Sequence, residues 1–440
     1  MQRIAFIFLH ALSSIQFWLS RRLTNVGKFV LAVLVISAAV GIDTDLTLAH
    51  QIFTLLVALF IFSFISNISF NLNFEVNRVL PPFVTAGETF QYQIYITNLG
   101  NNTKEGLLLI ETLADPRPTY NEYLLPARTK DKSKGSNVNA YRRWEALISE
   151  KMNGDIKEQQ LPKLLNKHVV EVSIEASAKH RGHIDFTETI IARLDPFGLF
   201  KTFAKTSTRQ TLLVLPKRYS LPALQLPGKR IYQHGGVTLA ASKGDTEEFI
   251  GLRDYREGDP LQHIHWKSFA RIGKPVVKEY QDEFFERYAL VVDTFTKAGA
   301  NNIFEEAVSL AASFACTIET QENLLDLMFV GAEAYTFTAG VGQLHTDSLL
   351  EILSCVRACE DKPFEELTES VMERRNCLSG CILIFTTWNK ARQQMVDELT
   401  ALELPLEIFV IKENEEATKD GGTGYHTLIV NKMPEGLANL

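Results

Sequence analysis

The densest group of charged, aromatic and histidine side chains lies between residues 247 and 283, which read EEFIGLRDYREGDPLQHIHWKSFARIGKPVVKEYQDE. His263 and His265 are two residues apart, so on a strand they would share a face. Together with Asp254 or Asp259 they could bind a metal ion. A metal-dependent hydrolase centred on these four residues is therefore one interpretation. A His-x-His pair alone is a weak signal, and the sequence points to no remote third ligand.

The same segment has the composition of an ion-pair network. Three bases could pair with four acids: Arg253, Lys267 and Arg271 with Asp254, Asp259, Glu279 and Glu283. Arginine supplies bidentate geometry to a carboxylate, and Trp266 is a large apolar anchor with one donor. Two further interpretations follow, a structural clasp between domains or a surface that binds a partner, since Trp and Arg are favoured in interface hot spots.

Other chemistry has little support in the chain. The sequence has neither a G-x-x-x-x-G-K-[ST] phosphate loop nor a G-x-S-x-G nucleophile elbow, so we expect neither ATP hydrolysis nor a serine hydrolase. The five cysteines all lie in the C-terminal third and are odd in number, which favours core thiols in a reducing compartment over disulfides or zinc. A net charge of −7 does not indicate the basic surface that nucleic-acid-binding domains usually have. We expect a protein that is not an enzyme and has no cofactor.

Apolar segments near the N-terminus predict a membrane anchor over residues 1–66. Residues 46–65 contain no charged side chain, and twenty residues cross about 30 Å of hydrocarbon. Residues 23–42 form a second span if Lys28 snorkels to the headgroups. Residues 43–45 (Asp-Thr-Asp) would be the polar tip of this helical hairpin.

The basic residues predict the orientation of the hairpin. Arg21, Arg22 and Lys28 flank the first span, and the tip has acids only. The positive-inside rule then gives a two-pass protein of the bacterial cytoplasmic membrane with its soluble domains in the cytoplasm. The apolar stretch Ile4–Leu19 is an in-plane helix, a third crossing or a cleaved signal, and the sequence leaves these three open.

The sequence after the predicted anchor indicates two further domains. Residues 67–217 alternate apolar and polar side chains between turn signals, which is typical of a β-sandwich. Its polar insertion, 120–167, is expected to be a solvated loop or a segment that leans on anionic lipid. In residues 288–440 strand-like runs alternate with helical stretches, which predicts an α/β domain with a mostly parallel sheet. The charged segment 218–287 lies between the two.

These motifs resemble those of the membrane-associated "domain of unknown function 58" family. The residues at matching positions are Leu252, Arg253, Asp254, Tyr255, Gly258, Asp259, Ile264, His265, Trp266, Lys267, Ala270, Arg271, Val277, Glu279 and Glu283. The turn at 195–200 (DPFGLF) and Pro216 also look like the family, and the resemblance extends from the two spans to near the end of the chain. Gln262 stands where the family more often has Arg, so no role of that Arg is carried over.

The resemblance implies that the last domain has a von Willebrand A-like fold of Rossmann type. In such folds an Asp-x-Ser-x-Ser motif after the first strand helps to hold magnesium, a cation that prefers oxygen ligands. Here Asp293 matches, but Phe295 and Lys297 occupy the two serine positions. We therefore expect a degenerate site, reduced to Asp293, Thr294 and Thr296, that binds no metal.

The resemblance also implies a partner, a MoxR-type AAA+ ATPase that acts in the assembly or maturation of other complexes. The leading hypothesis is a membrane-tethered cytoplasmic adaptor or scaffold that contacts this ATPase, other membrane or envelope proteins and the lipid bilayer. The metal-dependent hydrolase is one alternative. A cation-dependent adhesin outside the cell is another, although the basic residues at 21–28 and the altered metal motif count against it.

Overall fold

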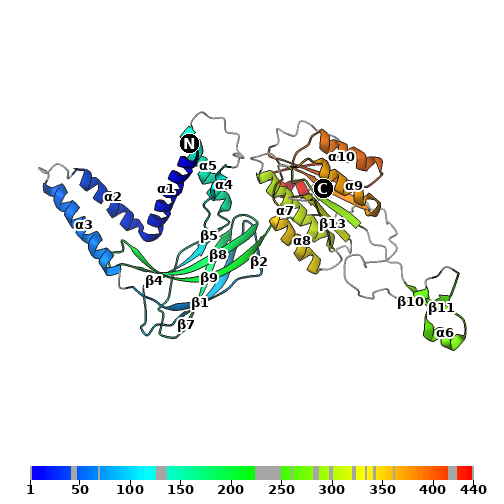
Figure 1. Cartoon of the computed structure of the whole chain (residues 1–440), viewed down its shortest axis with the longest axis horizontal. Coiled ribbons are helices and arrows are strands. Elements are labelled where there is room, and N and C mark those ends of the chain that lie inside the picture. The colour runs from blue at the N-terminus through cyan, green and yellow to red at the C-terminus, as the bar shows by residue number, and fades with distance from the viewer. Residues whose placement is uncertain are drawn as a thin grey trace. The chain divides into compact units, whose positions relative to one another are not determined.

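The computed structural model describes residues 2–40, 47–67, 70–124, 136–222, 249–257, 259, 261–280, 287–296, 301–319, 324–331, 334–339, 343–359, 362–414 and 424–438. The chain divides into two compact units, Met1–Pro216 and Lys217–Leu440 (Figure 1). Unit 1 contains apolar N-terminal helices and two β-sheets, and unit 2 contains a six-stranded sheet with helices and a separate two-stranded sheet.

Unit 1 begins with three apolar helices, α1 (Gln2–Arg22), α2 (Asn25–Val40) and α3 (Thr47–Asn67). By length and composition α1 and α3 could each cross a membrane, and α2 is a shorter apolar helix that packs against α3 (Figure 1). Their apolar surfaces indicate association with a membrane, as the sequence predicts. The expected polar tip, 43–45, lies outside the described residues.

A buried carboxylate ties α3 to the β-sheets. Asp195 is in the turn between β8 (Gly182–Leu194) and β9 (Lys201–Leu215). Its side chain accepts hydrogen bonds from the backbone N–H groups of Phe197 (3.3 Å) and Phe200 (2.8 Å) and from the hydroxyl of Ser63 in α3. The Phe60 ring of α3 packs edge-on against Phe200. Polar and aromatic contacts therefore fix the end of α3 on this turn.

The junction between α1 and α2 docks on the same turn. The backbone N–H of Thr24 donates to the carbonyl of Leu199 (3.0 Å), and its hydroxyl donates to the carbonyl of Gly198. One turn further along α2, a Cβ added to Gly27 would lie 2.2 Å from the Leu199 carbonyl oxygen. A side chain at position 27 would therefore have to push α2 off the turn.

We expect Gly27→Ala to destabilise the full chain in detergent. Helix propensity alone predicts the opposite, a gain of about 1 kcal/mol. The clash with the Leu199 carbonyl gives a loss, because backbone rather than a flexible side chain lies in the way. Thermal unfolding with Val26→Ala, an exposed neighbour, as the control measures the difference. A higher melting temperature for Gly27→Ala would show that α2 is not seated on the turn.

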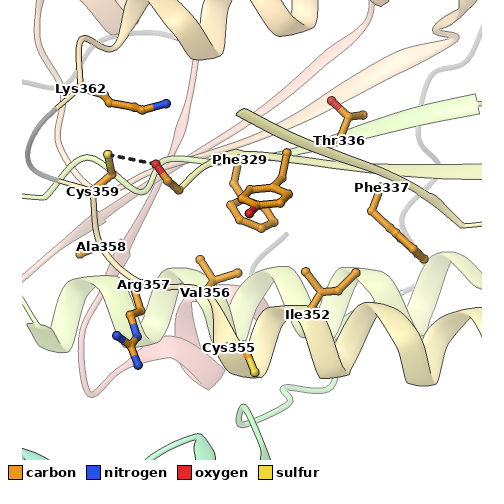
Figure 2. Close-up of a pocket in the computed structure, with 12 residues that line it drawn as sticks. Phe329, Thr336, Phe337, Ile352, Cys355, Val356, Arg357, Ala358, Cys359 and Lys362 are labelled. Atoms are coloured by element: carbon orange, nitrogen blue, oxygen red, sulfur yellow. Dashed lines mark hydrogen bonds between the residues drawn. The ribbon is translucent and has the colours of Figure 1, made fainter. Parts of the chain in front are cut away.

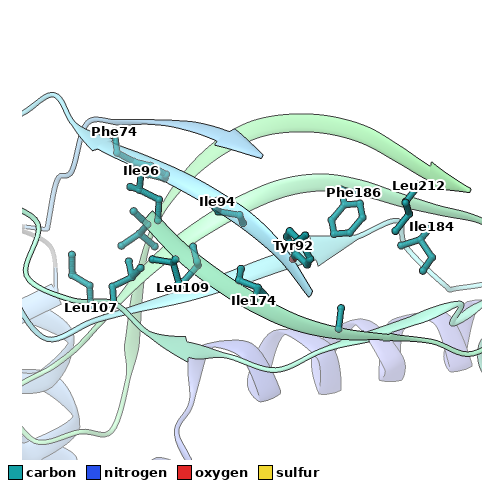
Figure 3. Close-up of a cluster of buried hydrophobic side chains, with 14 of the residues drawn as sticks. Phe74, Tyr92, Ile94, Ile96, Leu107, Leu109, Ile174, Ile184, Phe186 and Leu212 are labelled. Carbon is teal, nitrogen blue, oxygen red and sulfur yellow. The ribbon is translucent and has the colours of Figure 1, made fainter. Parts of the chain in front are cut away.

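Two sheets in unit 1 enclose one hydrophobic core (Figure 3). The first has the order β1 (Phe74–Val79), β3 (Thr89–Asn98), β7 (Val169–Ala178), β5 (Gly154–Ile156). The second has the order β2 (Phe83–Thr85), β9, β8, β4 (Leu107–Leu113), β6 (Gln159–Gln160). Alternate residues of β3, Tyr92, Ile94 and Ile96, are buried, as a strand with one face on the core requires.

Part of the segment expected to be a solvated loop is helical. It contains α4 (Tyr120–Leu124) and α5 (Ser136–Lys151), and the short strands β5 and β6 follow. Residues 125–135 lie outside the described residues. Trp144, Leu147 and Ile148 are three and four residues apart, so they share one face of α5. That face packs in a cluster with α1 in which Trp144 is buried. The helical spacing of these apolar residues therefore determines the structure of α5, although most residues of the segment are polar.

A buried ion pair crosses the core of the two sheets. Arg78 of β1 and Glu111 of β4 have no exposed side-chain surface, and the guanidinium donates to the Glu111 carboxylate. It also donates to the hydroxyls of Thr189 (3.0 Å) and Thr208 (2.9 Å) and lies 4.6 Å from the centre of the Phe186 ring. Burial raises the pKa of Glu111, and Arg78 opposes that shift.

Removing one partner should destabilise this unit strongly. Arg78→Met leaves the Glu111 carboxylate buried without its cation, which costs about 3–5 kcal/mol in comparable pairs. The double variant Arg78→Met/Glu111→Leu should recover most of that loss, because no charge is then buried. Denaturant unfolding of the four proteins tests this, and equal losses in single and double variants would contradict it.

Unit 2 is built on a six-stranded sheet. Its order is β14 (Ala334–Ala339), β13 (Leu324–Val330), β12 (Arg287–Val292), β15 (Gly380–Phe385), β16 (Leu406–Lys412), β17 (His426–Ile429). All pairs are parallel except the one between β13 and the edge strand β14. The described helices are α7 (Asn301–Glu319), α8 (Gln343–Cys355), α9 (Glu365–Arg374), α10 (Lys390–Ala401) and α11 (Met433–Ala438). This is the alternating mixed α/β arrangement that the sequence predicts.

Candidate functional site

The motif segment of unit 2 folds as a small module. Strand β10 (Phe249–Asp254) pairs antiparallel with β11 (Val276–Tyr280), and between them lie a 3-10 turn, η2 (Leu261–His263), and the short helix α6 (Trp266–Ile272). Val276, Val277 and Ile264 are its buried apolar residues. Gly273 ends α6 in the left-handed conformation, φ 73°, which favours glycine.

An ion pair closes the loop after β10. The Arg253 guanidinium donates to both oxygens of Asp259, at 2.7 and 2.8 Å, in a bidentate arrangement. The backbone N–H of Arg256 donates to the same carboxylate (2.8 Å). These donors, Arg253 first, lower the pKa of Asp259 to about 2. The carboxylate is therefore ionised at neutral pH and engaged in holding the loop.

The two histidines do not lie on a strand, as the metal interpretation assumes. His263 ends η2 and His265 precedes α6, where its Nδ1 lies 2.6 Å from the hydroxyl of Ser268. The expectation of a shared strand face was wrong because η2 ends at His263 and a helix starts directly after His265. Within the described parts of the chain, no three His, Cys, Asp or Glu side chains are grouped so that they could hold a metal ion.

The remaining motif residues surround this frame. Asp254 ends β10 and is exposed, and the Tyr255 N–H donates to the Pro275 carbonyl (3.0 Å), which closes the hairpin. Lys267 and Arg271 are exposed on α6. Glu279 lies in β11 opposite Gly251. Gly258, Glu283 and the side chain of Glu279 lie outside the described residues.

Helix α6 presents apolar side chains to the surface. Four of its seven residues are apolar, yet none is buried. Trp266 is 62% exposed and Ile272 61%, and Phe269 packs edge-on against Trp266 at 5.9 Å. Trp266, Phe269 and Ile272 recur every three residues and so lie along one side of the helix. We call these three residues the α6 patch.

A second constellation lies at the end of β12. Asp293 is fully buried, and its carboxylate oxygens accept from Nη2 (3.0 Å) and Nε (3.2 Å) of Arg392 in α10. The Thr386 hydroxyl donates to it as well (3.1 Å). The hydroxyl of Thr294 donates instead to the Val330 carbonyl. Burial raises the pKa of Asp293, and the guanidinium opposes that shift.

Arg392 holds the position that a cation would take beside Asp293. Its guanidinium also lies 3.9 Å from the centre of the Phe364 ring, so it is fixed on two sides. The Asp293 carboxylate, which matches the first residue of the metal-binding motif, is therefore engaged by a side chain, and the residues present do not fit a metal ion. The sequence reasoning missed Arg392, because 99 positions separate it from Asp293. The one local signal is the Asn389 cap, which starts α10.

We expect Arg392→Met to lower the free energy of unfolding of unit 2 by about 3–5 kcal/mol, since it leaves a buried carboxylate unpaired. Lys390→Met, exposed on the same helix, is the matched control and should be neutral. Urea unfolding is followed through near-UV signals, with and without millimolar Mg²⁺. Stabilisation of the unaltered protein by Mg²⁺ would contradict the replacement of the metal by Arg392.

An apolar pocket of about 700 Å³ opens between the β13–β14 edge and α8 (Figure 2). The rings of Phe329 and Tyr335 stack at 5.5 Å. Figure 2 shows Val356 and Ile352 of the opposite wall, below Phe329. Lys362 at one end pairs with Glu366 (3.0 Å). Most of the lining is apolar, and Cys355, Arg357, Cys359 and Lys362 also line the pocket.

Comparison with known proteins supports one relationship. Residues 251–376 match the family described as "Protein of unknown function DUF58". The chain is also similar to the "Uncharacterized protein YeaD" of Bacillus subtilis (strain 168), at 24% identity over 192 residues. This match covers 43% of the chain and 46% of YeaD, so the chain spans less than half of that relative's length.

Solved structures resemble the chain only slightly. The native conformation of E. coli alpha-2-macroglobulin matches with a TM-score of 0.19 and 17% identity over 36% of this chain and 8% of that protein. The PapD-like domain 7 of human CEP192 matches with a TM-score of 0.17 and 11% identity over 32% of this chain and 82% of that domain. At these scores neither likeness supports an inference.

Proposed function

Because residues 251–376 make this chain a member of the DUF58 family, we propose that it is a membrane-tethered adaptor whose α6 patch binds a partner protein. The observation that carries the proposal is that no residue of α6 is buried, although more than half of the helix is apolar. A structural clasp would bury these side chains within the chain. Trp is also the residue type most enriched in interface hot spots.

The module has the rigidity that a binding surface needs. The bidentate Arg253–Asp259 pair and the bond from Tyr255 to Pro275 hold the loops on both sides of α6. A preordered surface loses less conformational entropy on binding. Burial of each large apolar side chain is worth about 1.5–3 kcal/mol, so covering the α6 patch would favour binding of a partner.

The proposed partner is a MoxR-type AAA+ ATPase, as the family resemblance implies. The chain itself has no phosphate loop, so an adaptor of this kind would depend on its partner for energy. Arg21, Arg22 and Lys28 favour soluble units in the bacterial cytoplasm, with α2 and α3 as a two-pass anchor. Other membrane or envelope proteins would be the clients.

The sheet of unit 2 supports a von Willebrand A-like domain. Numbered from β12, its strands have the order 3-2-1-4-5-6 of Rossmann-type sheets, with the third strand antiparallel at the edge. The two sheets of unit 1 likewise support a β-sandwich. With Arg392 in place of a metal, we propose that the A-like domain serves as a binding platform without cofactor and without catalytic activity of its own.

Loss of the α6 patch should release the partner. We expect Trp266→Ala/Ile272→Ala to reduce recovery of the ATPase at least tenfold after mild crosslinking in native membranes and purification, because a loss of 1.4 kcal/mol is tenfold in affinity. Tyr335→Ala is the control, since Tyr335 is a half-exposed aromatic residue of the same unit outside α6. Circular dichroism checks that each variant is folded.

Two outcomes would count against the proposal. If a folded double variant keeps the ATPase at the unaltered level, the α6 patch is not the docking surface. If the purified chain instead contains stoichiometric zinc or manganese that is lost in His263→Ala/His265→Ala, the metal-dependent hydrolase becomes the better account.

A further inference from the structure

Helix α1 has one face packed against protein. Phe6 and Leu9 lie in a cluster with Tyr123 of α4 and Trp144 of α5. The Phe6 ring is 5.6 Å from the rings of both Tyr123 and Trp144. This contact buries Leu9, Tyr123 and Trp144, so α1 is part of the folded unit rather than a separate segment.

The opposite face of α1 is apolar and exposed. At 100° per residue, Ile4, Phe8, Ile15 and Trp18 lie within an arc of about 80°. All four are exposed, Ile4 by 74% and Phe8 by 64%. An apolar stripe along a whole helix is unfavourable in water, and here it continues into the apolar α2 and α3.

Charged groups flank the packed face. Arg117 donates to the Ser14 hydroxyl in the middle of α1 (2.6 Å) and pairs through Nε with Asp115 (2.8 Å). Glu122 of α4 pairs with Lys151 of α5 (2.7 Å), and both are partly exposed. A membrane crossing by α1 would carry these groups toward the hydrocarbon, at about 2.5–3.5 kcal/mol for a charged residue at mid-bilayer.

We propose that α1 lies in the plane of the membrane, with its exposed stripe in the boundary between headgroups and acyl chains and its packed face toward α4 and α5. The bilayer surface is the occupant of the stripe. Two arginines end α1, and the exposed Arg22 would lie near anionic headgroups. The inference concerns the anchor and does not depend on the docking function of α6.

This position makes the chain a two-pass protein with an interfacial helix. The α1–α2 junction is tied by Thr24 to the turn at Gly198 and Leu199, so the direction of the chain changes at a point fixed on the sheets. Such a helix would hold the two-sheet domain close to the bilayer at a set distance. With α1 in the membrane plane, α2 and α3 would be the two helices that cross the bilayer.

The depth of spin labels along the stripe separates the two arrangements. Ile4 and Ile15 are eleven residues apart, which is about 16 Å along a helix. In a crossing helix their depths would differ by up to that amount. In an in-plane helix, labels at Ile4→Cys, Phe8→Cys and Ile15→Cys should share one shallow depth, about 5–10 Å into the headgroup and acyl boundary.

The measurement uses the full chain in vesicles of zwitterionic and anionic phospholipid. The five native cysteines, all in unit 2, are first replaced by alanine, and circular dichroism checks the fold. Depth is read from the balance of oxygen and nickel-chelate accessibility. Leu55→Cys, exposed in the middle of α3, is the control and should report a position near the bilayer centre.

Equal shallow depths at the three α1 positions, with a deep Leu55 label, would support the in-plane helix. A steady change of depth from position 4 to position 15 would show that α1 leaves α4 and α5 and crosses the membrane. Labels fully accessible to the nickel chelate would show that the stripe faces water. Either result would overturn the proposal.

Discussion

The buried carboxylate of Asp195 is the constraint on which the arrangement of unit 1 depends. A buried charge is tolerated only when it is well hydrogen-bonded, and its donors here come from the turn itself and from Ser63 of α3. The turn and α3 therefore each supply part of the hydrogen bonding of the Asp195 carboxylate. Thr24 and Gly27 add the start of α2 to the same turn, which gives the two-sheet domain a fixed attachment to its anchor.

Two other buried acids are each paired with an arginine. Glu111 is held by Arg78 in the core of the sheets, and Asp293 by Arg392 at the end of β12. A buried ion pair adds little stability compared with apolar side chains of similar volume. Loss of one partner is strongly destabilising, because the other charge is then buried alone. Each pair therefore favours the one packing arrangement in which both partners meet. At Asp293 the carboxylate is held by the Arg392 guanidinium, which agrees with the proposed role of this domain as a binding platform without cofactor.

Much of this architecture can be predicted from the sequence, because apolar segments, period-two strands and the alternation of strands and helices are local patterns. The contacts that join distant positions cannot. Nothing local links Asp293 to Arg392 or Asp195 to Ser63. Trp144 lies in a stretch of mostly polar residues, so its helical spacing is a weak local signal. His263 and His265 have the spacing of a strand but lie in a turn and before a short helix.

The contacts of Asp195, Thr24 and Gly27 join α2, α3 and the two-sheet domain into one rigid platform. The most direct test is the distribution of distances between spin labels at Leu55 of α3 and Glu175 of β7, measured by pulsed electron resonance in bilayers, since both side chains are exposed. The account predicts one narrow distance that broadens when Asp195→Ala removes the shared acceptor. A broad distribution in the chain with Asp195 intact would contradict it, because the sheets would then swing freely from the membrane.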